Sequence, residues 1–103
     1  MTCIANGRVT CIKPARYVQQ LVSHWKHKMD ASWEPLANGG CGTFPFSDDT
    51  FATMVCERDM ISIQLTTASF ERNIEMRGVI ERHIERFAFR EAPLCYVWAQ
   101  EDV

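Results

Sequence analysis

The feature that most constrains this fold is a change in hydrophobic period, from helical in two flanking segments to alternating between them. Residues 29–67 alternate apolar and polar side chains and are interrupted by short turn sequences, a pattern typical of antiparallel strands. The flanking segments repeat their apolar residues every three or four positions, as amphipathic helices do. A chain of 103 residues supports one hydrophobic core, so helices and strands must share it.

Turn sequences divide the alternating region into strands. Residues 38–40, 47–49 and 57–59 are predicted to reverse the chain. Pro45 has no amide hydrogen, so its strand is expected to lie at an edge or to end there. The predicted strands contain Met29, Ala31 and Trp33; then Phe44 and Phe46; then residues 51–56; then residues 60–67.

A first helix is predicted over residues 14–28, after a short strand at residues 8–12. Pro14 suits the first helical position, because its missing amide hydrogen would have no partner there. The residues of this helix that fall on one apolar stripe are Val18, Leu21, Val22 and Trp25.

A second helix is predicted from an N-cap at Ser69 to about Phe89. Pro93 ends the helical region, and a last strand with period two follows. The apolar stripe of this helix is Met76, Ile80, Ile84 and Phe87, and the apolar residues of the strand are Leu94, Tyr96 and Trp98. The order β-α-β-β-β-β-α-β predicts one α+β domain over residues 1–103, a two-layer sandwich of a mostly antiparallel sheet with both helices on one face.

Composition excludes several classes of function. The net charge is -2 at pH 7 and basic residues are interleaved with acidic ones, which argues against a nucleic-acid binder. The sequence contains neither a secretion signal nor an apolar run long enough to span a membrane, so we expect a cytoplasmic protein that does not bind membranes. The five cysteines contain no CxxC pair, which disfavours disulfides and a zinc knuckle. Cys56 and Cys95 are predicted to be buried in strands, and Cys41 to be the most exposed thiol.

The three histidines are candidate metal or haem ligands. His24 and His27 project from neighbouring positions of one predicted helix, and His83 lies on the other. The alternative is that His27 is solvated and His83 is half-buried and hydrogen-bonded.

A second candidate site lies at the end of the second helix. Arg86 and Arg90 are four residues apart and repel each other unless a negative group lies between them. A bound carboxylate or phosphate would supply that charge, and so would Glu91, Glu85 or a carboxylate on another strand; such a structural ion pair is the preferred interpretation. His83 with Glu91 is the best catalytic pair that the sequence offers.

The tail HIERFAFREAPL at residues 83–94, followed by Trp98, resembles the ending of the bacterial family catalogued as domain of unknown function 2218. The segment ARYVQQLVSHWKHK at residues 15–28 is similar to an earlier motif of that family. The resemblance implies a small bacterial protein with no assigned activity. It also implies a context of iron-siderophore metabolism, with a siderophore-interacting flavoprotein as a partner.

The leading hypothesis is therefore a non-catalytic accessory or binding domain, rather than an enzyme, that serves iron-siderophore metabolism. One alternative is a metal- or haem-binding protein that uses His24, His27 and His83, and another is a small enzyme of unknown substrate. The sequence identifies no cofactor. The sheet face without helices carries Phe51 and Val55 among polar residues, so we also expect a homodimer.

Overall fold

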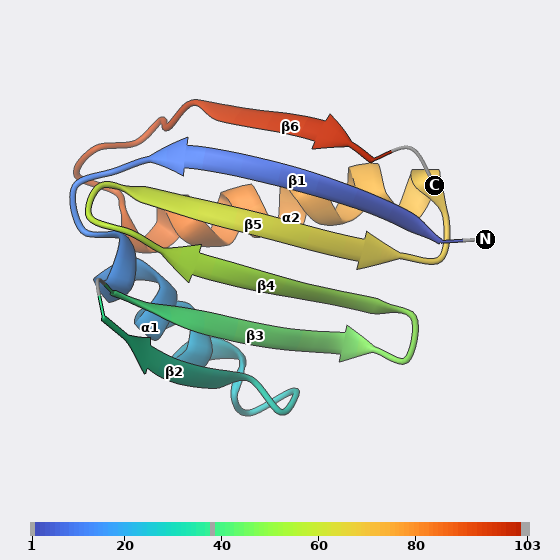
Figure 1. Ribbon diagram of the computed structural model, residues 1–103, viewed down its shortest axis with the longest axis horizontal. Helices are drawn as coiled ribbons and strands as arrows, with labels where there is room; N and C mark the ends of the chain where they lie inside the picture. Colours follow the sequence, from blue (N-terminus) through green and yellow to red (C-terminus); the bar gives the residue numbers. More distant parts are fainter. Residues whose placement is uncertain (1, 38, 102–103) are drawn as a thin grey trace.

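The computed structural model describes residues 2–37 and 39–101, which form six strands and two helices (Figure 1). Asn38, in the predicted turn 38–40, lies outside the described residues. The elements are β1 (Cys3–Thr10), α1 (Pro14–Trp25), β2 (Ser32–Leu36), β3 (Gly39–Ser47), β4 (Thr50–Cys56), β5 (Met60–Thr67), α2 (Phe70–Phe87) and β6 (Tyr96–Gln100). This order confirms the prediction from the sequence.

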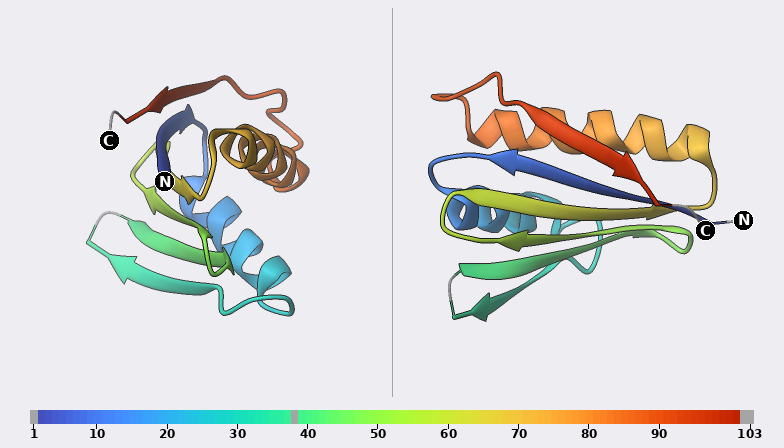
Figure 2. Two further views of the ribbon diagram at one scale, coloured as in Figure 1. Left: turned by 90° about the vertical axis from the view of Figure 1, so that its right-hand side faces the viewer. Right: turned by 45° about the horizontal axis from the view of Figure 1, so that its top comes forward.

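The six strands form one sheet in the order β2-β3-β4-β5-β1-β6, and every neighbouring pair is antiparallel. Strand β1 lies between β5 and β6, which therefore run in the same direction with α2 as their connection. Both helices cover the same face of the sheet, and the other face is open (Figure 2). The molecule is thus the predicted two-layer α+β sandwich.

The hydrophobic core lies between the sheet and the helices, where the predicted apolar stripes meet. In α1, Val18, Leu21, Val22 and Trp25 are all buried. In α2, Met76, Ile80 and Ile84 are buried, whereas Phe87 is only partly buried against the core. Strand β5 contributes Ile61, Ile63 and Leu65. The residues that strand alternation and helical spacing predict to be apolar and inward-facing are thus mostly the residues that form the core.

Two glycines allow bulky groups to approach the sheet on its helical face. A Cβ atom at Gly7 would lie 2.7 Å from the ring of Trp98, so the indole of β6 packs directly on the backbone of β1. A Cβ atom at Gly42 would lie 2.6 Å from Cγ1 of Val18, so α1 rests closely on β3. Both contacts require the absence of a side chain.

Several predicted boundaries need correction. Strand β1 covers residues 3–10 and not 8–12, and α1 ends at Trp25 and not at residue 28. The amide of Met29 donates to the carbonyl of Trp25 in the turn that ends α1, so β2 begins only at Ser32. Pro45 does not lie on an edge strand, but it lies in a part of β3 that pairs on one side only. Strand β3 is an inner strand that continues to Ser47, but its pairing with β2 stops at Thr43.

Helix α2 begins as predicted, because the Ser69 hydroxyl accepts a hydrogen bond of 3.1 Å from the amide of Arg72. It ends at Phe87, two residues earlier than expected.

Cys56 is buried as predicted, but Cys95 is exposed and Cys41 is half-buried, so the predictions for those two thiols are wrong. Cys95 precedes the edge strand β6, where few neighbours can cover it. Among the described residues, no helix is both long and apolar enough to cross a membrane.

Candidate functional site

A groove on the helical layer separates the start of α1 from the loop that follows α2; we call it the α1–α2 groove. Its deeper part is a pocket of about 360 Å³. This pocket is lined by residues of two segments, Ile12, Lys13, Arg16, Tyr17 and Gln20 from one and Phe87, Phe89, Arg90 and Glu91 from the other. A shallower hollow of about 600 Å³ continues along α1 past His24 and His27, and it shares Arg16, Gln20 and Phe87 with the pocket.

The ends of the two helices position these side chains. Because Arg16 and Gln20 are four residues apart on α1, they lie on the same side of the helix. On the other wall, α2 ends at Phe87 and the buried methyl group of Ala88 anchors the turn that follows. Phe89 and Arg90 therefore extend outward, and the Phe89 side chain is 68% exposed.

Glu91 ties the two walls of the groove together. Its Oε2 accepts a hydrogen bond of 2.6 Å from the hydroxyl of Tyr17 and one of 3.0 Å from the amide of Ile12. The hydrogen bond to Glu91, followed by burial, raises the pKa of Tyr17 to about 12. The negative charge of Glu91 is thus used in holding α1 against the loop.

Among the described residues, neither Arg86 nor Arg90 forms the predicted ion pair. The salt bridge found there joins Arg72 and Glu75 on α2. The guanidinium of Arg86 instead lies 6.0 Å from the ring centre of Phe87, and that of Arg90 lies 5.9 Å from the ring centre of Phe89. Glu91 binds Tyr17 and Ile12 rather than an arginine. The prediction that acidic neighbours hold these arginines is therefore wrong.

The structure brings two of the three histidines together. The ring centres of His24 and His83 are 5.4 Å apart, and His83 also packs on Trp25 at 4.7 Å. His83 is half-buried, and its Nδ1 donates to the carbonyl of Val79 at 2.7 Å. Burial, and then the positive charge of Arg86, lower the pKa of His24.

His27 is exposed and lines the shallow hollow with His24. In the part of the chain that the structure describes, no three His, Cys, Asp or Glu side chains are grouped as metal ligands. His83 is also not among the described residues that line the groove, whereas Glu91 is. The geometry therefore gives no support to a metal site or to a His83–Glu91 catalytic pair.

Lys13 and Gln20 are groove residues that were not selected from the sequence, and Arg16 and Phe89 were noted only as parts of the two motifs. One polar group among them lacks a partner, since Oε1 of Gln20 is buried without a hydrogen bond. The sequence signal that could have located the groove is the pair of family motifs. The segments at residues 15–28 and 83–94 lie far apart in the chain, yet they form the two walls of this one groove.

Comparison with known proteins agrees with this description. The model of the family described as "Uncharacterized protein conserved in bacteria (DUF2218)" matches residues 6–99. Among solved structures, the chain is similar to PA4090 from Pseudomonas aeruginosa, determined by NMR, with a TM-score of 0.72 and 24% identity over 93% of this chain and 94% of that one. No curated protein matches the sequence. The chain belongs to the DUF2218 family, as its motifs predicted, and the solved structure shows the same fold.

Proposed function

We propose that this member of the DUF2218 family is a non-catalytic binding domain whose α1–α2 groove holds a small organic anion with an aromatic or apolar part. The observation that carries the proposal is the placement of Lys13, Arg16 and Arg90 around one pocket. None of the three forms a salt bridge within the described residues. A bound carboxylate or phosphate would supply the missing negative charge.

Glu91, the acidic residue of the pocket, forms no salt bridge with Lys13, Arg16 or Arg90 among the described residues. Glu91 already accepts hydrogen bonds from the Tyr17 hydroxyl and the Ile12 amide. The first turn of α1 contains no acidic residue, and no side chain caps it. The positive end of the helix dipole therefore adds to the attraction for an anion at this place.

The other walls of the pocket suit an apolar group. Phe87 is half-buried and Phe89 is 68% exposed, so both present ring surface to the groove. Gln20 adds a polar side chain to the same lining. The volume of about 360 Å³ lies within the range of about 300 to 1,000 Å³ that is usual for small-molecule sites.

The predicted link to iron-siderophore metabolism fits within this proposal, because catecholate siderophores combine aromatic rings with negative charge. In that context, the expected protein partner is a siderophore-interacting flavoprotein. Binding, rather than catalysis, is the better-supported function. Glu91, the carboxylate among the described residues that line the pocket, has a structural role in joining the two walls.

The proposal is tested by titrating labelled protein with benzoate, with its neutral counterpart benzamide, and with inorganic phosphate, while recording amide chemical shifts. We expect benzoate to shift the resonances of Arg16, Gln20 and Phe89 with a dissociation constant of about 1 mM, and benzamide to bind more weakly. A ferric catecholate complex is the second probe, for the siderophore link.

Two variants provide the specificity control. Arg16→Gln and Arg90→Gln should each weaken benzoate binding by about tenfold, because each removes a charged donor. Arg82→Gln is the matched control, since Arg82 is exposed on α2 and does not line the groove. If benzoate produces no shifts at the groove, or if the Arg16 and Arg90 variants bind it as well as the Arg82 variant does, the proposal is wrong.

A further inference from the structure

The open face of the sheet has a row of residues that ends in two opposite charges. Strand pairing aligns Arg8 with Ser62, Ser62 with Val55, Val55 with Cys41, and Cys41 with Glu34. These five residues therefore lie on one line across β1, β5, β4, β3 and β2. Arg8 and Glu34 are four strand spacings apart, about 19 Å, which is too far for their side chains to meet within one chain.

The two charges are placed symmetrically. Val55 on β4 lies two strands from Arg8 on β1 and two strands from Glu34 on β2. A two-fold axis that runs above the sheet, parallel to β4, would exchange the positions of β1 and β2. Arg8 of each copy would then face Glu34 of the other copy, and two equal ion pairs would form.

We infer that this open face is the interface of a homodimer, with Arg8 and Glu34 as the reciprocal pair. Phe51 and Val55, 43% and 37% exposed, both lie on β4 and so lie along the proposed axis. Each would pack against its own copy at the centre of the interface. An apolar centre with charges toward its margin is the usual arrangement in protein interfaces.

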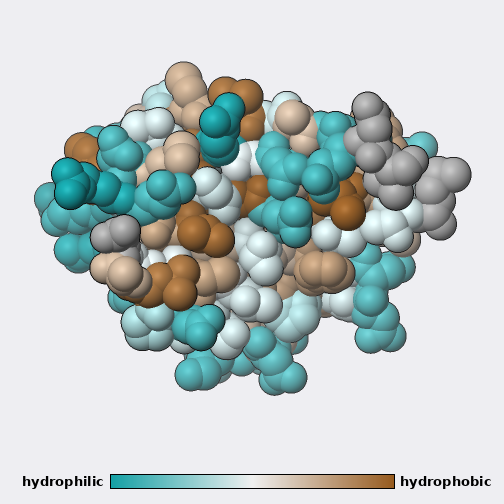
Figure 3. All heavy atoms as spheres, in the orientation of Figure 1, coloured by the Kyte–Doolittle hydropathy of each residue, from teal (hydrophilic) through white to brown (hydrophobic). Residues whose placement is uncertain are grey.

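The rest of the face suits contact with a second sheet. Within the strands that the structure describes, Arg8 and Glu34 are the charged residues whose side chains point to this side, although 23% of the whole chain is charged. Depletion of charge is a feature of the central part of interfaces. Figure 3 shows this face, with hydrophobic patches among weakly polar residues near its middle.

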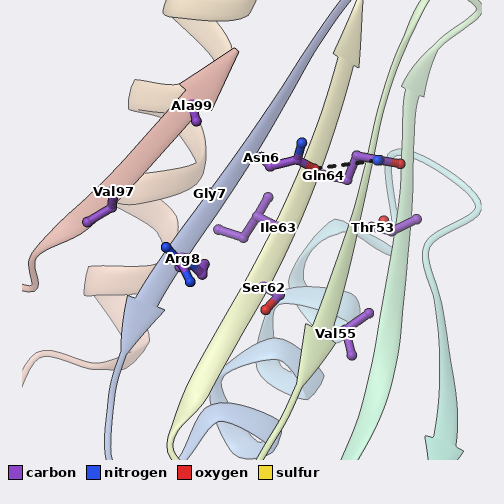
Figure 4. Close-up of a pocket in the computed structure, with 10 residues that line it drawn as sticks. All are labelled: Asn6, Gly7, Arg8, Thr53, Val55, Ser62, Ile63, Gln64, Val97 and Ala99. Atoms are coloured by element: carbon purple, nitrogen blue, oxygen red, sulfur yellow. Dashed lines mark hydrogen bonds between the residues drawn. The ribbon is translucent and has the colours of Figure 1, made fainter. Parts of the chain in front are cut away.

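A hollow gives the partner's side chain access to Arg8. Its volume is about 520 Å³, and its lining comes from β1, β4, β5 and β6 (Figure 4). Arg8 and Ser62 lie within it, between Val55 on one side and Val97 on the other. The proposed axis places β2 of the partner above β1, so Glu34 of the partner enters this hollow.

The dimensions allow a weak dimer. Packed sheets are about 10 Å apart, a gap that arginine and glutamate side chains can span from opposite sides. Their length also accommodates the crossing of about 30° that is usual for packed sheets. Five strand widths of about 4.8 Å and a strand length of about 24 Å give roughly 580 Å² of projected area per copy, or about 1,150 Å² in total, which is the size of a weak interface.

The test is sedimentation velocity of the full chain between about 5 and about 500 μM, the range in which an interface of this size should dissociate. We expect Arg8→Glu and Glu34→Arg each to weaken the dimer by at least about tenfold, because like charges would face each other. The combined Arg8→Glu/Glu34→Arg variant should dimerise like the original protein. Val55→Glu should remain monomeric.

Charge reversals on the opposite layer are the matched controls. Arg82→Glu and Glu71→Arg lie on α2 and should leave dimerisation unchanged, and thermal melting checks that every variant is folded. The inference is overturned by a monomer at the highest concentration, by a dimer that Arg8→Glu and Val55→Glu do not weaken, or by failure of the combined reversal to restore it. Both helices lie on the other side of the sheet (Figure 2), and the residues of the α1–α2 groove belong to that helical layer, so the dimer test does not depend on ligand binding.

Discussion

The hydroxyl of Tyr17 lies 2.6 Å from Oε2 of Glu91, and this hydrogen bond joins residues 74 positions apart in the chain. The same oxygen accepts the amide of Ile12 at 3.0 Å. One carboxylate thus fastens the start of α1 to the loop that follows α2, and so sets the width of the groove between them.

Removal of this carboxylate should destabilise the protein. Glu91→Ala leaves the Tyr17 hydroxyl and the Ile12 amide without their partner, so we expect the free energy of unfolding to fall by about 1 to 3 kcal/mol. Tyr17→Phe should cost less, because the Ile12 amide keeps its bond. Urea denaturation of both single variants and the double variant measures the coupling. Strictly additive effects would show that the two residues do not interact.

The tyrosines of the folded protein should ionise well above their ordinary pKa of about 10. The chain has two tyrosines. The hydrogen bond to Glu91 and burial raise the pKa of Tyr17 from 10.0 to about 12, and burial, followed by the charge of Glu85, also raises the pKa of Tyr96. A raised folded-state pKa favours the protonated form, so stability should be lost as pH rises above about 10.

An ultraviolet titration of phenolate absorbance, followed together with circular dichroism, checks this expectation. Phenolate should appear well above pH 10, either in the folded protein or together with the loss of structure. Tyr17→Phe should reduce the phenolate signal and make the alkaline loss of stability less steep. Ionisation of either tyrosine near pH 10 in folded protein would contradict the prediction.

Acid should destabilise the protein through His24. Burial and the nearby charge of Arg86 lower its pKa below 6.5, so the unfolded chain binds a proton more readily than the folded one. Stability should therefore fall as pH decreases through 6.5, and the loss should be complete below the folded-state pKa. The melting temperature of His24→Gln should depend less on pH between about 7 and about 5. His27→Gln, at an exposed position, is the control and should keep the original dependence.

Three residues at the end of α2 should differ sharply in their contribution to stability. Ile84 is fully buried, so Ile84→Ala should cost about 2 to 5 kcal/mol. Phe87→Ala should cost less than the roughly 3 to 5 kcal/mol of a fully buried phenylalanine, because its ring is only partly covered. Phe89→Ala should change stability by less than about 0.5 kcal/mol, since Phe89 is 68% exposed. Guanidinium denaturation of the three variants measures the order, and a large loss at Phe89 would contradict it.

The helices and strands could be predicted because the pattern of each is contained in residues that are close together in the sequence. Pro14 and Ser69 begin the two helices, and the spacings of Val18 to Trp25 and of Met76 to Ile84 identify the buried sides. The alternation of Ile61, Ile63 and Leu65 identified the inner face of β5 in the same way. The layer arrangement followed, because amphipathic helices and a one-sided sheet must bury their apolar surfaces together.

Partners that are distant in the chain were decided by the tertiary structure alone. Periodicity indicates that a residue is buried or exposed, but it does not say what the residue contacts. Glu91 had an arginine on its N-terminal side in the sequence, yet it binds Tyr17 and Ile12, because the fold brings α1 beside the loop. Cys95 follows an apolar neighbour as a core residue would, yet it is exposed beside the edge strand β6. Strand order also created the row from Arg8 to Glu34, since hydrogen bonding between strands aligns residues that have no relation in the sequence.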